Sequence, residues 1–229
     1  MRRIVITGVG RGLGRALAQR WAERDEVWGT TRTGTTDLPL AGCLCIDLAD
    51  EGSIVAGAAA LRASVPGVDL LVNCAGVDAR AFGAPEDPRG PFDVPAHMWK
   101  ALFDVNVVGP MVFTRELLPL LRNGSQPLVV NVSSQLGSMQ VAATKGRDTS
   151  YCVSKAALNM FSVKAAAELR PAGVGVVMLH PGWVQTDMGG RSAPLTIAES
   201  ADAIVATVDA LTLADSGRFI RWDGTDHPW

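Results

Sequence analysis

The sequence predicts an α/β protein in which helices cover both faces of one doubly wound parallel sheet, giving three layers, α/β/α. Short apolar runs alternate with longer helical stretches along the chain, as in proteins built from strand–helix–strand units. The runs are almost continuously apolar, as expected of parallel strands that are buried on both faces. Right-handed crossovers between such strands place helices on both sides of the sheet.

The first half of the chain is expected to contain four strands and two helices. Leu13, Leu17 and Trp21 share one stripe of the first helix, and an alanine-rich run indicates the second. In chain order the predicted elements are a strand at 3–7, a helix at 14–24, strands at 26–31 and 43–47, a helix at 53–63 and a strand at 69–73.

The second half begins with a loop at 78–94, which is rich in proline and glycine. A long helix is expected over 95–121, because Pro95 suits a first helical turn, with a bend near Gly109 and Pro110. The remaining predicted elements are a strand at 128–133, an irregular segment, a helix at 151–169, a strand at 174–179, a helix at 198–211 and a short strand at 219–222.

Composition and charge fit an ordinary globular protein. Hydrophobic residues make up 48% of the chain, enough to cover a sheet on both faces. The formal charge of −2 argues against nucleic acid or an anionic membrane as the partner. No apolar run approaches the roughly 18 residues that cross a bilayer. Because the strand–helix alternation resumes after the 78–94 loop, residues 1–229 are predicted to form a single domain.

The cysteines and the first residues of the chain bear on its compartment. Four cysteines show neither metal-ligand spacing nor a secreted framework, so no metal site is predicted. Cys43 and Cys45 are expected to be buried in a strand. No signal-peptide pattern follows Met1. A cytoplasmic location is therefore expected.

A glycine-rich turn, TGVGRGLG at 7–14, joins the first strand to the first helix. Glycines let the backbone approach a pyrophosphate, and the N–H groups at a helix N-terminus attract negative charge. A glycine cluster alone is weak evidence, but here the strand before it and the helix after it are both expected. The residues predicted to bind a dinucleotide in this turn are Gly8, Gly10, Arg11, Gly12, Leu13 and Gly14.

Arg32 follows the second strand, 18 residues after Gly14, where the two nicotinamide cofactors are distinguished. In NAD-binding folds an acidic residue at about this place holds the ribose 2′-hydroxyl. A guanidinium can instead bind a 2′-phosphate with two hydrogen bonds, and Arg11 could approach the same phosphate. The prediction is NADP(H) in preference to NAD(H), the alternative being that both arginines are solvated surface charges.

Tyr151 and Lys155 are four residues apart on a predicted helix, so they share one face. A free tyrosine has a pKa of about 10, and a nearby ammonium lowers it. Such a tyrosine can protonate a carbonyl oxygen while hydride reaches the carbon. Tyr151 is the only tyrosine in the chain, which makes a chance pair on a helix surface the weaker interpretation.

Two serines end the fifth strand, at the carboxyl edge where open α/β sheets bind ligands. A serine hydroxyl there can hydrogen-bond a substrate oxygen and stabilise the charge that develops on it. Ser133 and Ser134 face opposite ways, because alternate strand positions do, so only one of them can hydrogen-bond the substrate oxygen.

These motifs, in this order and at these distances, resemble the classical short-chain dehydrogenase/reductases over essentially the whole chain. The spacing TGxxxGxG is typical of that family, whose fold is a Rossmann-type sheet. Segments 133–138, 151–159 and 222–229 look like the C-factor and sniffer-type carbonyl reductases. The resemblance implies an oxidoreductase that uses NADPH to reduce a ketone or aldehyde, with Tyr151 as the general acid.

The resemblance also implies roles for further residues. It favours Ser134 as the group that polarises the carbonyl, and it gives Asn106 a part in holding a proton-relay water near Lys155. From the sequence alone, Asn106 could equally be bonded to the backbone inside a helix. The other implied cofactor contacts are Asp47 for the adenine ring and its neighbour Leu48, then Asn73, Ala75 and Gly76 in a turn, Tyr151 and Lys155, and Pro181, Gly182, Val184 and Thr186, the last for the nicotinamide carboxamide.

Substrate-pocket candidates are apolar and lie near the expected lid. Met139, Trp183 and Met188 could line a pocket, although each could equally be core. The lid, 187–194, is short and glycine-rich, and is expected to be small and mobile. Compared with the family, extra residues precede Tyr151, which indicates an inserted loop at 140–149. The substrate is expected to be a small-molecule carbonyl or alcohol.

Two other functions fit less well. An NADPH-binding signalling or sensor protein of C-factor type would need little turnover, yet the serine, tyrosine and lysine are all present. A sugar-nucleotide epimerase needs more than the 43 residues that follow Thr186. Related enzymes pair through long helices such as 95–121 and 151–169, so a homo-dimer or homo-tetramer is expected.

Overall fold

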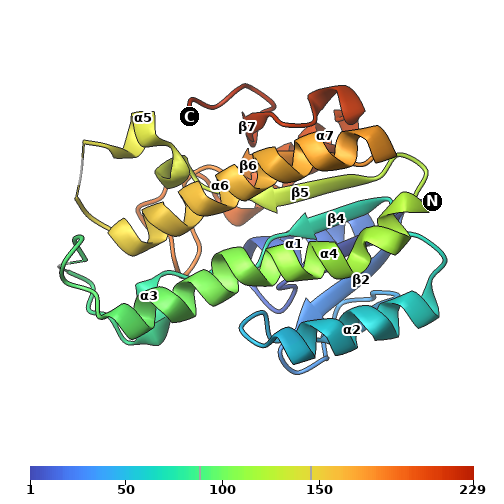
Figure 1. Cartoon of the computed structure of the whole chain (residues 1–229), viewed down its shortest axis with the longest axis horizontal. Helices are drawn as coiled ribbons and strands as arrows, with labels where there is room; N and C mark the ends of the chain where they lie inside the picture. Colours follow the sequence, from blue (N-terminus) through green and yellow to red (C-terminus); the bar gives the residue numbers. More distant parts are fainter. Residues whose placement is uncertain (88, 145) are drawn as a thin grey trace.

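The computed structural model describes residues 1–87, 89–144 and 146–229, which build one seven-stranded sheet between two layers of helices (Figure 1). The strand order is β3-β2-β1-β4-β5-β6-β7, and every neighbouring pair is parallel. This confirms the predicted doubly wound, three-layer fold. The strands are β1 (Arg3–Thr7), β2 (Glu26–Thr31), β3 (Gly42–Cys45), β4 (Leu70–Asn73), β5 (Leu128–Val132), β6 (Gly175–His180) and β7 (Phe219–Arg221).

Helices cover both faces of this sheet (Figure 1). One face is covered by α1 (Gly12–Ala22) and α7 (Ile197–Ala210). The other is covered by α2 (Glu51–Ser64), α4 (Gly109–Arg122) and α6 (Thr149–Leu169). Shorter helical segments are α3 (Ala96–Phe103), α5 (Met139–Ala142) and 3-10 turns at Ala79–Phe82, Gln135–Gly137, Arg170–Ala172 and Leu213–Asp215. In the described ranges, no helix is both long and apolar enough to cross a membrane.

Two apolar layers hold the helices to the sheet. Leu17 and Trp21, on the predicted stripe of α1, are fully buried against β1 and α7. Phe113 of α4 is fully buried in the opposite layer. Burying one such side chain stabilises a fold by about 2–3 kcal/mol. These layers fix the strands, so the loops at the strand ends start from rigid positions.

The predicted long helix over 95–121 is interrupted by a π-helical turn, Asp104–Val108, between α3 and α4. Pro110 has no N–H to donate to the carbonyl of Asn106, four residues earlier, so the regular ladder cannot continue there. Gly109 allows a close approach, since a Cβ at that position would lie 2.6 Å from the carbonyl oxygen of Leu48. The expected irregularity therefore takes the form of a π turn directly before Gly109.

The prediction for Cys43 and Cys45 is wrong. In β3 only Leu44 is buried, whereas Cys43 is half-buried and Cys45 is exposed. β3 is the edge strand of the sheet, so its second face is only partly covered. The Cys45 thiol lies at the surface and donates to the carbonyl oxygen of Arg32 at 3.2 Å.

The other edge strand, β7, is covered by the chain that follows it. Residues 225–227 fold back along β7 in the antiparallel direction. The N–H of Arg221 donates to the carbonyl oxygen of Thr225 at 2.8 Å, and the N–H of His227 donates to that of Phe219 at 2.8 Å.

Candidate active site

The predicted motifs gather at one edge of the sheet. The glycine turn follows β1, the 73–76 turn follows β4, the two serines follow β5, and the 181–186 segment follows β6. In a parallel sheet all these positions are carboxyl ends of strands, so they lie on the same edge. The 140–149 insertion falls partly outside the described residues, at 145, and α5 occupies its beginning.

The glycine turn has the geometry of an anion cradle. Gly8 and Gly12 have φ of +79° and +59°, which favours glycine. A Cβ at Gly14 would lie 2.5 Å from the carbonyl oxygen of Gly8, so the helix packs directly on the turn. Arg11 precedes α1 with extended backbone, and in the described structure its side chain does not cap the helix. The first-turn N–H groups are thus suited to a phosphate.

The two arginines predicted to bind a 2′-phosphate are both exposed. Arg11 forms an ion pair with Asp187 of the lid, in which the two side chains are 78% and 80% exposed. Arg32 lies just beyond β2. Asp187 was absent from the predicted site, although its place directly after Thr186 could have indicated it.

Asp47 and Leu48 follow β3 but have different surroundings. Asp47 is exposed, and its Oδ1 accepts from the N–H of Ala49 at 2.9 Å. The side chain of Leu48 belongs to the core, so a cofactor contact from Leu48 would have to come from its backbone.

The turn after β4 lies against the glycine turn. A Cβ at Gly8 would lie 3.0 Å from the Cβ of Ala75. A Cβ at Gly76 would lie 3.4 Å from both Asn106 Oδ1 and Lys155 Nζ, so Gly76 leaves these two groups uncovered. The side chain of Asn73 bonds instead to Thr114 and Asn131.

The side chain of Asn73 belongs to a buried polar network between β4, β5 and the helices. Its Nδ2 donates to Asn131 Oδ1 at 2.8 Å and to Thr114 Oγ1 at 3.1 Å. Asn131 in turn donates to Ser162 Oγ at 2.8 Å. The network joins two central strands to α4 and α6, which fixes the start of the turn.

Tyr151 and Lys155 lie in the first turns of α6, as predicted, with Lys155 Nζ 5.7 Å from the centre of the tyrosine ring. Lys155 is buried and donates from Nζ to the carbonyl oxygen of Val132 at 2.8 Å. Burial lowers the pKa of this lysine to about 8. Its ammonium is therefore easier to deprotonate than that of a surface lysine.

The expected lowering of the Tyr151 pKa is outweighed by burial. Burial of the phenol raises its pKa well above the ordinary value, while the neighbouring Ser134 hydroxyl acts in the opposite direction. The carboxylates of Asp78 and Asp148 raise it further. The phenol is consequently held in its protonated form, which is the form that can donate a proton.

The two serines have different partners. Ser133 Oγ donates to Asn159 Oδ1 at 2.6 Å, and Asn159 donates to the carbonyl oxygen of Gly137 at 3.3 Å. Ser134 lies beside Tyr151, and its Oγ accepts from the N–H of Leu136 at 3.1 Å. The hydroxyl of Ser134 can therefore still donate a hydrogen bond, whereas that of Ser133 donates to Asn159 of α6.

Asn106 lies in the π turn and is bonded to backbone through its side chain. Its Oδ1 accepts from the N–H of Val77 at 2.9 Å, and its Nδ2 donates to the Val77 carbonyl at 2.8 Å. Nδ2 also contacts Ser154 Oγ at 3.1 Å. The side chain thus links the β4 turn to α6, and the part of Asn106 in holding a proton-relay water near Lys155 stays a prediction.

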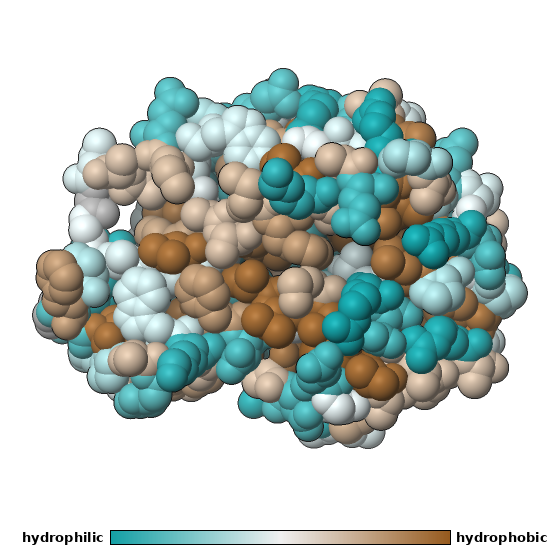
Figure 2. Space-filling model, viewed as in Figure 1, coloured by the Kyte–Doolittle hydropathy of each residue, from teal (hydrophilic) through white to brown (hydrophobic). Residues whose placement is uncertain are grey.

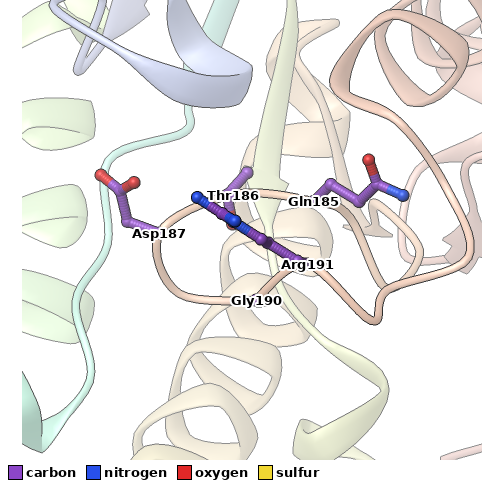
Figure 3. A pocket seen from close by; sticks show the side chains of 5 residues that line it. All are labelled: Gln185, Thr186, Asp187, Gly190 and Arg191. Carbon is purple, nitrogen blue, oxygen red and sulfur yellow. The ribbon is translucent and has the colours of Figure 1, made fainter.

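The lid segment is folded on itself and lines an open cavity of about 410 Å³ (Figure 3). Trp183 Nε1 donates to the carbonyl oxygen of Gly189 at 2.8 Å, and the N–H of Gly190 donates to that of Thr186 at 2.9 Å. Figure 3 shows Asp187 and Gln185 on opposite sides of this loop. The cavity is lined by Gln185, Thr186, Asp187, Gly190 and Arg191.

The segment 181–186 brings its residues to the glycine turn and the core. A Cβ at Gly12 would lie 3.9 Å from the Thr186 methyl group, so Thr186 is next to the cradle. Gly182 has φ of +87°. Val184 is buried, and the carbonyl oxygen of Pro181 accepts from Ser200 Oγ at 2.7 Å.

The three substrate-pocket candidates are surface residues. Met139 is 76% exposed, Trp183 48% and Met188 36%, which excludes the alternative that they belong to the core. His180, at the end of β6, is buried against Trp222, and burial lowers its pKa to about 3. It is a neutral packing residue.

Arg80 joins the turn after β4 to the lid, a contact that the sequence motifs did not indicate. Its Nε donates to Asp78 Oδ2 at 2.9 Å, and its Nη2 donates to the carbonyl oxygen of Met188 at 2.8 Å. The hydrogen bond with Asp78, and after it the pairing with Glu86, raise the pKa of this guanidinium above its ordinary value and outweigh the opposing effect of burial, so it stays charged. The lid is thereby tied to the rigid end of β4.

The model of the short chain dehydrogenase family matches residues 2–194 of the chain. The chain belongs to the short-chain dehydrogenase family. This short-chain dehydrogenase is 41% identical to the C-signal protein of Myxococcus xanthus over 164 residues, which cover 71% of this chain and 93% of that protein. Family and relatives together make it an NAD(P)-dependent oxidoreductase.

Two solved structures match this short-chain dehydrogenase over its whole length. The carbonyl reductase Sniffer of D. melanogaster has a TM-score of 0.88 at 29% identity, with 100% of both chains covered. The NADPH-bound carbonyl reductase from chicken fatty liver has a TM-score of 0.88 at 29% identity, covering 100% of this chain and 99% of that one. The predicted likeness to the C-factor and sniffer group is confirmed.

Proposed function

We propose that this short-chain dehydrogenase uses NADPH to reduce a ketone or aldehyde group of a small molecule. The observation that carries the proposal is the meeting of Ser134, Tyr151 and Lys155 beside the turn that holds Gly76. A protonated phenol, a serine hydroxyl and a buried ammonium are the groups that a carbonyl reduction needs at the oxygen atom.

Each of the three residues has a different role at the carbonyl oxygen of the substrate. NADPH, when bound, supplies the hydride that reaches the carbonyl carbon. The hydroxyl of Ser134 donates a hydrogen bond to the carbonyl oxygen, and Tyr151 transfers its phenolic proton to that oxygen as negative charge develops there. Lys155 stabilises the phenolate that remains. The product is an alcohol, and reprotonation of the phenol restores the site.

The cofactor fits the cradle formed by the glycine turn. The uncapped first turn of α1 suits the pyrophosphate, and we propose that Arg32 and Arg11 bind the 2′-phosphate. Both guanidinium groups are exposed, and no carboxylate ends β2. The NADPH bound to the chicken carbonyl reductase supports the same preference.

The remaining predicted contacts complete the proposed cofactor site. Asp47 and the Leu48 backbone serve the adenine end, and Thr186 serves the nicotinamide carboxamide. Asn73, Ala75, Gly76, Pro181, Gly182 and Val184 shape the turns between these ends through their backbone.

A titration with NADPH and NADH, followed by a carbonyl panel, tests the proposal. Purified protein should bind NADPH at least about tenfold more tightly than NADH, because a charge-assisted contact is worth roughly 1.5–3 kcal/mol. Arg32→Ala should remove most of that difference. NADPH oxidation with aldehydes, ketones and diketones should then be lost in Tyr151→Phe. Equal binding of both cofactors would contradict the role of Arg11 and Arg32.

A second function is an NADPH-binding signal or sensor protein with little turnover, which the similarity to the C-signal protein favours. The same experiment separates the two. Tight NADPH binding without oxidation on any carbonyl supports the sensor, whereas turnover that depends on Tyr151 supports the reductase.

Assembly and location are proposed on separate grounds. Apolar side chains of the π turn, α4 and α6 are exposed on the face that Figure 2 shows, and we propose that two copies of the chain pair through them. They are Val108, Met111, Val153 and Met160. Four free thiols fit a reducing compartment such as the cytoplasm. Sedimentation of the protein with Met160→Lys tests the pairing.

A further inference from the structure

Two carboxylates face Tyr151 from different elements, and each is paired with an arginine of the segment between β4 and α3. Asp78 pairs with Arg80, and Asp148, directly before α6, pairs with Arg89. Burial is the largest cause of the raised pKa of Tyr151, and both carboxylates raise it further. Each carboxylate that acts on the phenol is thus itself paired with a positive charge.

The pair of Arg89 with Asp148 has the more deeply buried arginine, since the Arg89 side chain is only 6% exposed. Its Nε donates to Asp148 Oδ1 at 2.7 Å, and its Nη1 donates to the carbonyl oxygens of Pro85 and Glu86. The N–H of Thr149, the first residue of α6, donates to the Arg89 carbonyl at 3.2 Å. Main chain and side chain of Arg89 thus both hold the start of α6.

Asp148 has an unusual backbone for the residue that precedes a helix. Its φ is 55°, the one positive value outside glycine in the described part of the chain. An aspartate at this position usually accepts hydrogen bonds from first-turn N–H groups, but among the described residues its carboxylate makes no such bond. The carboxylate is bound by Arg89 instead, so the catalytic helix begins at an ion pair.

We propose that Arg89 is a positioning residue: by pairing with Asp148 it fixes the first turn of α6 and offsets part of the negative charge that Asp148 presents to Tyr151. The inference rests on the proposed role of Tyr151 as proton donor. Tyr151 lies three residues after Asp148, so a displaced first turn displaces the phenol. An unpaired carboxylate so close to Tyr151 in the chain disfavours the phenolate that proton transfer leaves behind.

The other groups that face Tyr151 come from three elements and stay unchanged in the test. The Ser134 hydroxyl follows β5, and Lys155 Nζ lies 5.7 Å from the ring centre. The Asp78 carboxylate is held by Arg80. The remaining titratable neighbour is the thiol of Cys152.

The absorbance of tyrosinate in the near ultraviolet provides a direct test. Tyr151 is the only tyrosine in the chain, so its ionisation is measured without substrate or turnover. The full chain, Arg89→Gln and Asp148→Asn are titrated with alkali while circular dichroism follows folding. Asp148→Asn should form tyrosinate at lower pH and Arg89→Gln at higher pH. Each should change the phenolate fraction at a given pH by about tenfold.

Opposite shifts of the tyrosine titration in the two single variants indicate an effect of charge, whereas loosening of the helix would shift both titrations in the same direction. The variant with both changes has lost both charges and should titrate close to the unchanged chain. Arg20→Gln, which breaks the exposed pair with Asp202 between α1 and α7, should have no effect. The proposal is overturned if both single variants shift the titration of Tyr151 in the same direction. It is also overturned if Tyr151 in Asp148→Asn ionises at no lower pH than in the unchanged chain. A chain that reduces no carbonyl still gives this result, so the two proposals fail separately.

Discussion

The cofactor side and the substrate side of the site are built by different means. On the cofactor side, neighbouring glycines between β1 and α1 shape the cradle, and a Cβ at Gly14 would meet the Gly8 carbonyl. On the substrate side, segments far apart in the chain are joined by side chains. Arg80 reaches Met188 of the lid, and Arg89 reaches the start of α6. The first side depends on local backbone, the second on long-range polar contacts, so they should respond differently to substitution.

The largest expected effect separates the two sides directly. Tyr151→Phe removes the proton donor without changing the cradle, so kcat should fall by about 10²–10⁴-fold while NADPH affinity changes far less than kcat. Stopped-flow reduction and a fluorescence titration measure the two quantities. A parallel loss of NADPH affinity would mean that the sides are coupled.

A substitution in the cradle should do the reverse. Gly14→Ala places a Cβ 2.5 Å from the Gly8 carbonyl oxygen, and such overpacking costs about 1–3 kcal/mol of unfolding free energy. NADPH affinity should fall as well, because the turn must move. Gly10→Ala is the matched control, since its nearest neighbour, the Thr31 methyl group, is 3.7 Å away. Urea unfolding should show little change for Gly10→Ala, and an equal loss in both variants would contradict the steric argument.

The pH dependence should report on the substrate side. Burial lowers the pKa of Lys155 to about 8 from the ordinary 10.5, so the ammonium is present below pH 8 and is lost as the pH rises through 8. The ratio kcat/KM should therefore decline from about pH 8 upward, because it reports groups of the free enzyme. The exposed Lys164 of the same helix gives a control, Lys164→Gln, with an unchanged profile. A decline that begins only near 10.5 would contradict the effect of burial.

The smallest expected effect concerns the one ion pair described between the two sides. Asp187→Asn removes the partner of Arg11, frees its guanidinium and takes a negative charge away from the cradle. Both side chains are well exposed, so NADPH should bind no more than about fivefold more tightly. Titration at low and high salt measures this, and weaker binding would show that Asp187 helps the cofactor rather than competing with it.

The sequence predicted the cofactor side far better than the substrate side. Strand positions and the glycine turn follow from local apolar runs and spacing, and β1 and β2 have the predicted bounds. Choosing Ser134 over Ser133 needed a family resemblance, because the strand pattern alone leaves both open. Arg80 and Arg89 belong to a proline-rich loop without a motif, and their partners are distant in the chain, so no local pattern could indicate them.

One strand and one helix show what depends on packing. Cys45 is expected inside because its strand is apolar in sequence, but an edge strand is covered less completely than a central one. The irregularity expected near Gly109 is present and takes the form of a π turn, because Pro110 lacks an N–H and Gly109 packs on Leu48. The edge position of the strand and the contact of Gly109 with Leu48 both depend on the fold, which the sequence does not state.

The fold-back of 225–227 along β7 bears on how the protein behaves at high concentration. Open sheet edges present unpaired N–H and C=O groups that recruit strands from other molecules and start aggregates. Here the backbone groups of Phe219 and Arg221 are already bonded to the returning chain. The opposite edge, β3, is only four residues long. Neither edge offers a long template, so a concentrated solution of this protein should resist β-mediated precipitation.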